Sequence, residues 1–152
     1  MKRLVTALAI LLLIPSLVMA AGSCVVTSKE LVSVQGVTQR IYITLTCTGD
    51  GTIADYTFTP ATQGVRGWYL YNVTTNPGTN APTNLYDITL VSNGEDVAGG
   101  LLANRSSTAT ETVVVAPATL GYHMTDQSIA ITFANQTASP SVIVMTLRFT
   151  SN

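Results

Sequence analysis

The stretch IVMTLRF, residues 143–149, decides the fold class of this 152-residue chain. Every second residue in it is large and apolar. The residues concerned are Ile143, Met145, Leu147 and Phe149. Alternation with a period of two places such side chains on one face of an extended strand. The stretch therefore predicts a β-strand with one long buried face.

Similar patterns recur upstream along the chain. Segments of strand character lie at residues 41–47, 56–59, 68–71, 86–90, 113–115 and 129–133. Turn residues such as Asn93-Gly94 separate them. The weak helical candidate at 97–104 contains two glycines, which favour no more than a turn. We therefore predict an all-β fold: a single-domain β-sandwich, immunoglobulin-like or jelly-roll-like, with about seven to nine strands over residues 21–152.

The first twenty residues are typical of a secretory signal peptide. Lys2 and Arg3 form a basic head, an uncharged apolar run follows, and small residues close it at Ala20 and Ala21. A membrane anchor is the alternative, but the run is short for a span and Pro15 interrupts it. We expect cleavage after Ala20 or Ala21, and export to the periplasm, the cell surface or the medium. Contact with a membrane is expected only through this leader.

The charge balance argues against nucleic-acid binding. The chain has 7 basic and 8 acidic residues, and Lys2 and Arg3 lie in the leader. The remainder is mildly acidic and has no basic stripe. Binding through phosphate neutralisation is therefore not expected.

Cys24 and Cys47 are the only cysteines. Gln35-Gly36 lies midway between them, so folding the chain about this point brings the two cysteines opposite each other, which favours a disulfide. The same folding puts Glu30 opposite Ile41, which points to a bulge or a longer loop. Two alternatives stay open: the AGSC sequence at 21–24 resembles a weak lipidation motif, and both thiols could be free.

Enzymatic machinery is hard to find. His123 is the only histidine, and no Gly-x-Ser-x-Gly motif occurs. The acidic pair Glu95-Asp96 could contribute to a calcium site, but a solvated hairpin turn is the expectation. Two cysteines and one histidine do not make a zinc site. We therefore predict no catalytic residues, no cofactor and no metal.

Trp68, Tyr69 and Tyr71 form an aromatic cluster that could stack on a sugar. Strand alternation places Trp68 on the face opposite the two tyrosines. Because aromatic residues dominate sandwich cores, packing is favoured over ligand binding for at least part of the cluster. Trp68 remains a candidate interaction residue.

The middle of the chain carries a resemblance. The motifs are VTTNPGTNAPTNLYDITL at 73–90, Asp96-Val97, Gly99-Gly100 and ANRSSTATE at 103–111. This segment, roughly residues 73–111, resembles small β-rich virion-associated proteins of tailed bacteriophages. The resemblance implies a non-enzymatic particle component or decoration, with no catalytic residues to carry over. The leader and the cysteine pair depart from that group and point to a related module exported by its host.

Asn104 and Arg105 are the candidate interaction residues in this segment. Asn104 suits a left-handed turn position, and Arg105 could pair with Asp96 or Asp87, as a loop contact or as part of a partner site. Our overall interpretation is a secreted, non-enzymatic structural or interaction module whose partners are proteins, through self-association or within a larger particle. A carbohydrate-binding module is the alternative.

Overall fold

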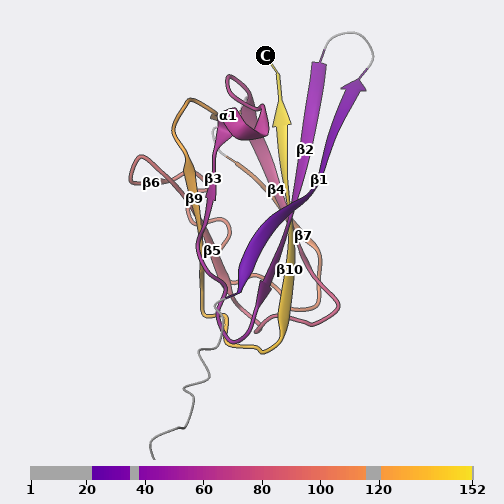
Figure 1. Ribbon diagram of the computed structural model, residues 1–152, viewed down its shortest axis with the longest axis vertical. Coiled ribbons are helices and arrows are strands. Elements are labelled where there is room, and N and C mark those ends of the chain that lie inside the picture. The colour runs from indigo at the N-terminus through magenta and orange to yellow at the C-terminus, as the bar shows by residue number, and fades with distance from the viewer. Residues whose placement is uncertain (1–21, 35–37, 116–120, 152) are drawn as a thin grey trace, which may run out of the picture.

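The computed structural model describes residues 22–34, 38–115 and 121–151, and it is built from two antiparallel sheets packed face to face (Figure 1). The leader at 1–20 lies outside the described residues. The larger sheet has the order β1 (Ser23–Val34), β2 (Thr38–Gly49), β10 (Ser141–Thr150), β4 (Tyr69–Pro77) and β7 (Glu111–Val114), and β8 (Tyr122–His123) also pairs with β4. The smaller sheet has the order β3 (Tyr56–Phe58), β9 (Ile129–Ala134), β5 (Asp87–Ser92) and β6 (Glu95–Asp96).

This architecture confirms the predicted all-β sandwich. The described residues contain ten strands, because the two-residue strands β6 and β8 add to those that the sequence pattern reveals. The helix α1 (Pro60–Gln63) is a single turn at one end of the sandwich. Residues 97–104 form turns, as their glycines predict. No helix among the described residues is long and apolar enough to cross a membrane.

Strand β10 is central to the larger sheet, where β2 and β4 pair with its two edges. Its burial alternates strictly, and the predicted apolar face is the buried one. Phe149 is fully buried, and its ring stacks on Phe58 of the opposite sheet with 5.8 Å between ring centroids. The stretch that predicts the fold therefore also joins the two layers.

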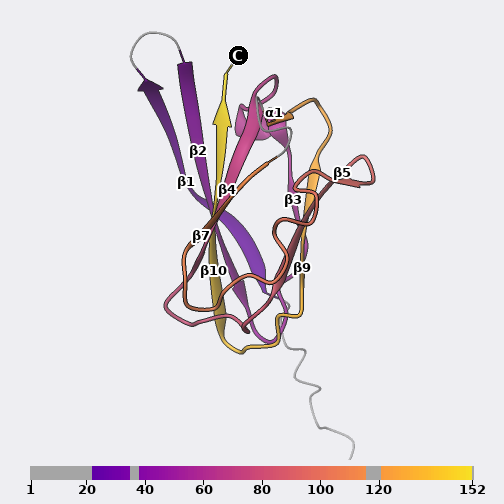
Figure 2. The same cartoon turned by 180° about the vertical axis from the view of Figure 1, so that it is seen from behind.

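The β1–β2 hairpin forms one edge of the larger sheet. Cys24 lies opposite Cys47, whereas Leu31 lies opposite Ile41, because the register shifts by one residue between Val26 and Ser28. The extra residue is Thr27, so of the two expected alternatives, a bulge or a longer loop, a bulge is present. Towards Val34 the hairpin leans away from the smaller sheet, as both views show (Figures 1 and 2).

Candidate functional site

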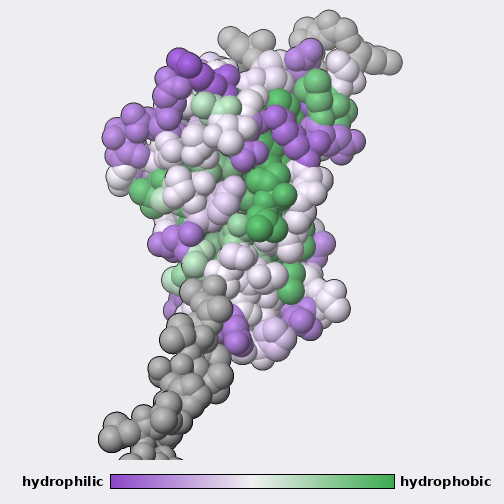
Figure 3. All heavy atoms as spheres, viewed as in Figure 1, coloured by the Kyte–Doolittle hydropathy of each residue, from purple (hydrophilic) through white to green (hydrophobic). Residues whose placement is uncertain are grey.

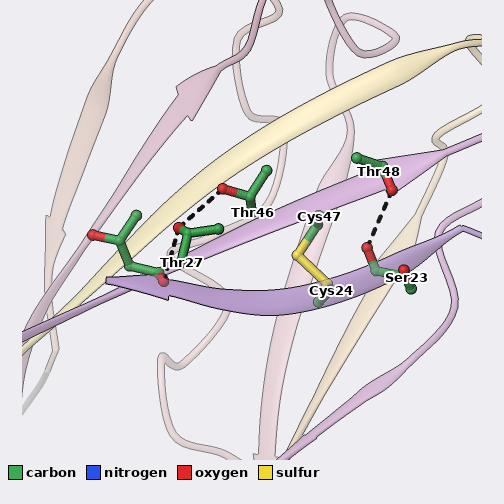
Figure 4. Close-up of a disulfide and its surroundings, with 7 residues drawn as sticks. Ser23, Cys24, Thr27, Thr46, Cys47 and Thr48 are labelled. Atoms are coloured by element: carbon green, nitrogen blue, oxygen red, sulfur yellow. Dashed lines mark hydrogen bonds between the residues drawn. A yellow bond between two sulfur atoms is a disulfide. The ribbon is translucent and has the colours of Figure 1, made fainter. Parts of the chain in front are cut away.

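A disulfide joins Cys24 to Cys47 across the β1–β2 hairpin (Figure 4). Both residues face the core, and Cys47 is fully buried. Hydrogen bonds flank the bridge: the Thr27 and Thr46 hydroxyls lie 3.1 Å apart, and the Thr48 hydroxyl donates to the Ser23 carbonyl. The disulfide prediction is confirmed, and the free-thiol and lipidation alternatives do not fit a paired Cys24. A disulfide is typical of an oxidising, extracytoplasmic environment.

Arg105 points into the protein. The residue is 5% exposed, its Nε donates to Thr75 Oγ1 at 3.1 Å, and the same nitrogen lies 3.4 Å from Glu111 Oε2. Arg105 therefore pairs with Glu111 rather than with Asp96 or Asp87. The buried Tyr86 lies nearby: burial raises the pKa of its hydroxyl, while Thr75 and Arg105 act in the opposite direction. This geometry fastens the 101–111 segment to β4 and leaves little of the guanidinium for a partner.

Asn104 occupies the left-handed position that the sequence indicates, with φ of 54°. Its side chain is exposed, and its backbone N–H donates to Asp87 Oδ1 at 2.7 Å. The other Asp87 oxygen accepts a bond from Asn135 Nδ2. Asp87 therefore ties two neighbouring turns together, and Asn104 belongs to that connection.

Trp68 is separated from the tyrosines that follow it. Trp68 is half-buried against the core, and Leu70 is buried, while Tyr69 and Tyr71 lie on the outer face of the larger sheet. The predicted split of the aromatic cluster is thus present. Trp68 packs against the core from one face and the two tyrosines lie on the other, and all three side chains are half-buried.

His123 is exposed on β8, and its ring lies 4.9 Å from the Tyr69 ring, centroid to centroid. Within the described ranges, no group of three or more His, Cys, Asp or Glu side chains could hold a metal ion.

Asp96 differs from the solvated turn residue that the sequence suggested. One of its carboxylate oxygens accepts backbone N–H bonds from Leu90 and Ala98, and the other accepts one from Gly100 at 2.6 Å. Glu95, next to it, is exposed. Glu95 is thus open to solvent, whereas Asp96 holds the 96–100 loop in place. Sequence reasoning missed this role of Asp96 because hydrogen bonds within a loop leave no periodic pattern in the sequence.

We expect Asp96→Ala to lower the free energy of unfolding by about 1–3 kcal/mol, because three backbone donors lose their acceptor. The matched Glu95→Ala variant should stay within about 0.5 kcal/mol of the wild type. Urea unfolding followed by circular dichroism compares the two. Equal effects of the two substitutions would contradict the anchoring role of Asp96.

The outer face of the larger sheet carries a cluster of two arginines and two tyrosines, hereafter the Arg–Tyr cluster: Arg40, Tyr42, Tyr71 and Arg148. The Arg40 guanidinium carbon lies 5.6 Å from the centre of the Tyr71 ring, reaching from β2 across β10 to β4. The Arg148 guanidinium carbon lies 5.5 Å from the centre of the Tyr42 ring. All four side chains are half-buried. Guanidinium groups held over aromatic rings are stabilised by the ring quadrupole and lose mobility.

The charge of the Arg–Tyr cluster is positive at ordinary pH. Burial raises the pKa of Tyr71, and the Tyr42 side chain adds to the shift, so Tyr71 stays neutral. Sequence reasoning found Tyr71 but missed both arginines. A signal exists: Arg40 precedes Ile41 and Arg148 precedes Phe149, so each occupies an outward position of a strand. Their proximity depends on the pairing of β2 with β10, which the sequence alone does not give.

The chain matches no protein-family model, and searches of curated proteins and of solved structures found no similar protein.

Proposed function

We propose that this chain is an exported, non-enzymatic structural module that associates with a second copy of itself through the free edge of β1. The observation that carries the proposal is the edge itself. Among the described residues, strand β1, with 12 residues, pairs with β2 on one side only, apart from the bridge between Gly22 and Ile53. A long edge strand presents unpaired backbone donors and acceptors to another strand.

The side chains along this edge favour association. Leu31 is 62% exposed although it lies opposite the buried Ile41, because the hairpin leans away from the smaller sheet at this point. Figure 3 shows hydrophobic surface on this upper part of the hairpin and in a band between β1 and the smaller sheet. The Lys29 side chain reaches from β1 to α1, where its Nζ donates to the Gln63 carbonyl at 2.5 Å. An exposed apolar side chain on a long edge is a recognised association site.

An antiparallel pair of β1 strands centred on Leu31 is compatible with the sequence. A two-fold axis through Leu31 sets this residue against its copy, Lys29 against Ser33, and Glu30 against Val32. Axes through Lys29 or Glu30 would oppose like charges, which destabilises a cross-strand pair. Isologous pairing about a two-fold axis is also the commonest way in which identical chains associate.

Two further observations support the wider role. The leader and the disulfide both favour an extracytoplasmic location. The resemblance of residues 73–111 to virion-associated proteins supports a component of a larger assembly.

If the chain is exported and processed, N-terminal sequencing should begin at Ala21 or Gly22, and an exported chain still starting at Met1 would contradict cleavage.

Substitution of Leu31 tests the association. We expect Leu31→Lys to weaken self-association at least about tenfold, because it sets two ammonium groups against each other at the axis. Val114→Lys is the matched control, since Val114 is similarly exposed, at 56%, on the opposite edge strand β7. Sedimentation equilibrium over a concentration series measures both variants.

A cross-link locates the axis. Leu31→Cys should form a disulfide-linked dimer under mild oxidation, whereas Val25→Cys should not, because Val25 lies far from its own copy in this register. A wild type that stays monomeric at all concentrations, or equal effects of Leu31→Lys and Val114→Lys, would overturn the proposed association.

A further inference from the structure

We propose that the Arg–Tyr cluster on the outer face of the larger sheet is a binding site for a carboxylated polysaccharide of the uronic-acid type. The inference is independent of the pairing of β1 edges. It rests on which cations of the protein lack a partner, on where they lie, and on the polar groups around them.

The basic residues outside the leader differ in whether they have a partner. Five basic residues follow the leader. Arg66 pairs with Asp126, Arg105 pairs with Glu111, and Lys29 donates to a carbonyl. In the part of the chain that the structure describes, Arg40 and Arg148 are the two arginines without an ion pair. Arg40 lies on β2 and Arg148 on the adjacent strand β10, and both side chains are on the outer face of the larger sheet.

The side chains of Arg40 and Arg148 are both held in position by their neighbours. Each lies over a tyrosine ring, so the side chains are ordered before any ligand arrives. Ordering in advance reduces the entropy lost on binding. A guanidinium presents its donors in a plane that matches the two oxygens of a carboxylate. Glu30, opposite Tyr42 on β1, is the nearby carboxylate, but it forms no ion pair with either arginine.

The polar groups beside Arg148 favour a sugar over an acidic peptide. Arg148 lies directly opposite Asn72 on β4, and Arg148 Nε and Asn72 Oδ1 are a donor and an acceptor that both lack hydrogen-bond partners. A hydroxyl group can accept from the first and donate to the second, whereas a carboxylate can only accept. Both atoms are buried, so this contact requires the Arg148 side chain to shift when the ligand binds.

The surroundings of the cluster fit the same ligand. A row of threonines crosses four neighbouring strands beside it, at positions 112, 74, 146 and 44. The hydroxyl oxygens of Thr44 and Thr146 lie 3.2 Å apart, and those of Thr74 and Thr112 lie 2.8 Å apart. Tyr69 adds an aromatic ring at the far side. A sheet face that offers a row of threonine hydroxyls and two guanidinium groups suits an extended chain of acidic sugars better than a compact ligand.

Binding of an alginate oligosaccharide, measured by isothermal titration calorimetry on the purified protein, tests the inference. The double variant Arg40→Gln/Arg148→Gln should bind alginate about ten- to hundredfold more weakly than the wild type, because it loses the charge-assisted hydrogen bonds of two guanidiniums. Arg66→Gln, the matched control, removes one exposed arginine elsewhere and should bind like the wild type. Melting temperatures of all variants check that folding is intact.

Two further probes separate the chemistry. Neutral dextran should bind much more weakly than alginate, because it lacks the carboxylate. Poly-glutamate should also bind more weakly, because it lacks hydroxyls. No alginate binding by the wild type, or an equal loss in Arg66→Gln, would overturn the site. Poly-glutamate binding as tight as alginate binding would overturn the sugar and assign the face to an acidic protein segment.

Discussion

Phe149→Ala should lower the free energy of unfolding by about 3–5 kcal/mol, the range typical of a fully buried aromatic residue. Phe149 is 0% exposed in the central strand of the larger sheet, and its ring stacks on Phe58 of the smaller sheet. Alanine would remove that contact and leave a cavity between the two layers. Small domains are stable by about 5–15 kcal/mol, so the variant should be close to the limit of folding.

A control on the same strand isolates the effect of burial. Val144 lies on the outer face of β10 and is half-buried, so Val144→Ala should cost about 1 kcal/mol or less. Guanidinium unfolding followed by intrinsic fluorescence and by circular dichroism gives both values. A loss in Phe149→Ala no greater than that in Val144→Ala would contradict a core that joins the sheets through this residue.

The second large effect is expected from the disulfide. Its cysteines are 23 residues apart in the sequence, and closing a loop of this length contributes about 3 kcal/mol in the chain-entropy account. Cys24→Ala/Cys47→Ala should therefore unfold at clearly lower denaturant concentration. Because β1 pairs with a single strand within the described part of the chain, hydrogen exchange should accelerate first in β1.

Reduction provides the matching control. Dithiothreitol should lower the unfolding midpoint of the wild type towards that of the double variant, and should leave the double variant unchanged. A wild type that is insensitive to reductant would contradict a stabilising bridge. If the free β1 edge mediates association, the double variant should also associate more weakly, since its edge strand is less firmly held.

The sequence predicted the features that depend on local alternation. Buried residues recur at every second position of β10, so its face could be assigned from residues 143–149 alone. The mismatch between the Cys24–Cys47 pairing and the pairing of Ile41 predicted a bulge or a longer loop, and the shift at Thr27 shows that a bulge is present. These predictions hold because one buried sheet face imposes a period of two on the sequence.

Features that depend on distant pairings were beyond the sequence. Arg105 pairs with Glu111 because the 101–111 segment turns its guanidinium inward, and no spacing rule indicates that. Arg40 and Arg148 are 108 positions apart in the numbering and become neighbours only because β10 lies beside β2. Asp96 serves as an anchor because its own loop curls back onto it. Each case depends on tertiary placement rather than on residue type.

The position of β10 has a consequence for the order of folding. This strand follows every other described strand in the sequence, yet it is the one that separates β2 from β4. During vectorial synthesis or translocation, the β1–β2 hairpin and its disulfide can form once residue 47 has emerged. The larger sheet must nevertheless wait with two open edges until residues 141–150 arrive. Such long-range closure is slow and exposes unpaired strands to neighbouring chains, so nascent copies should be most vulnerable to misassembly just before β10 inserts.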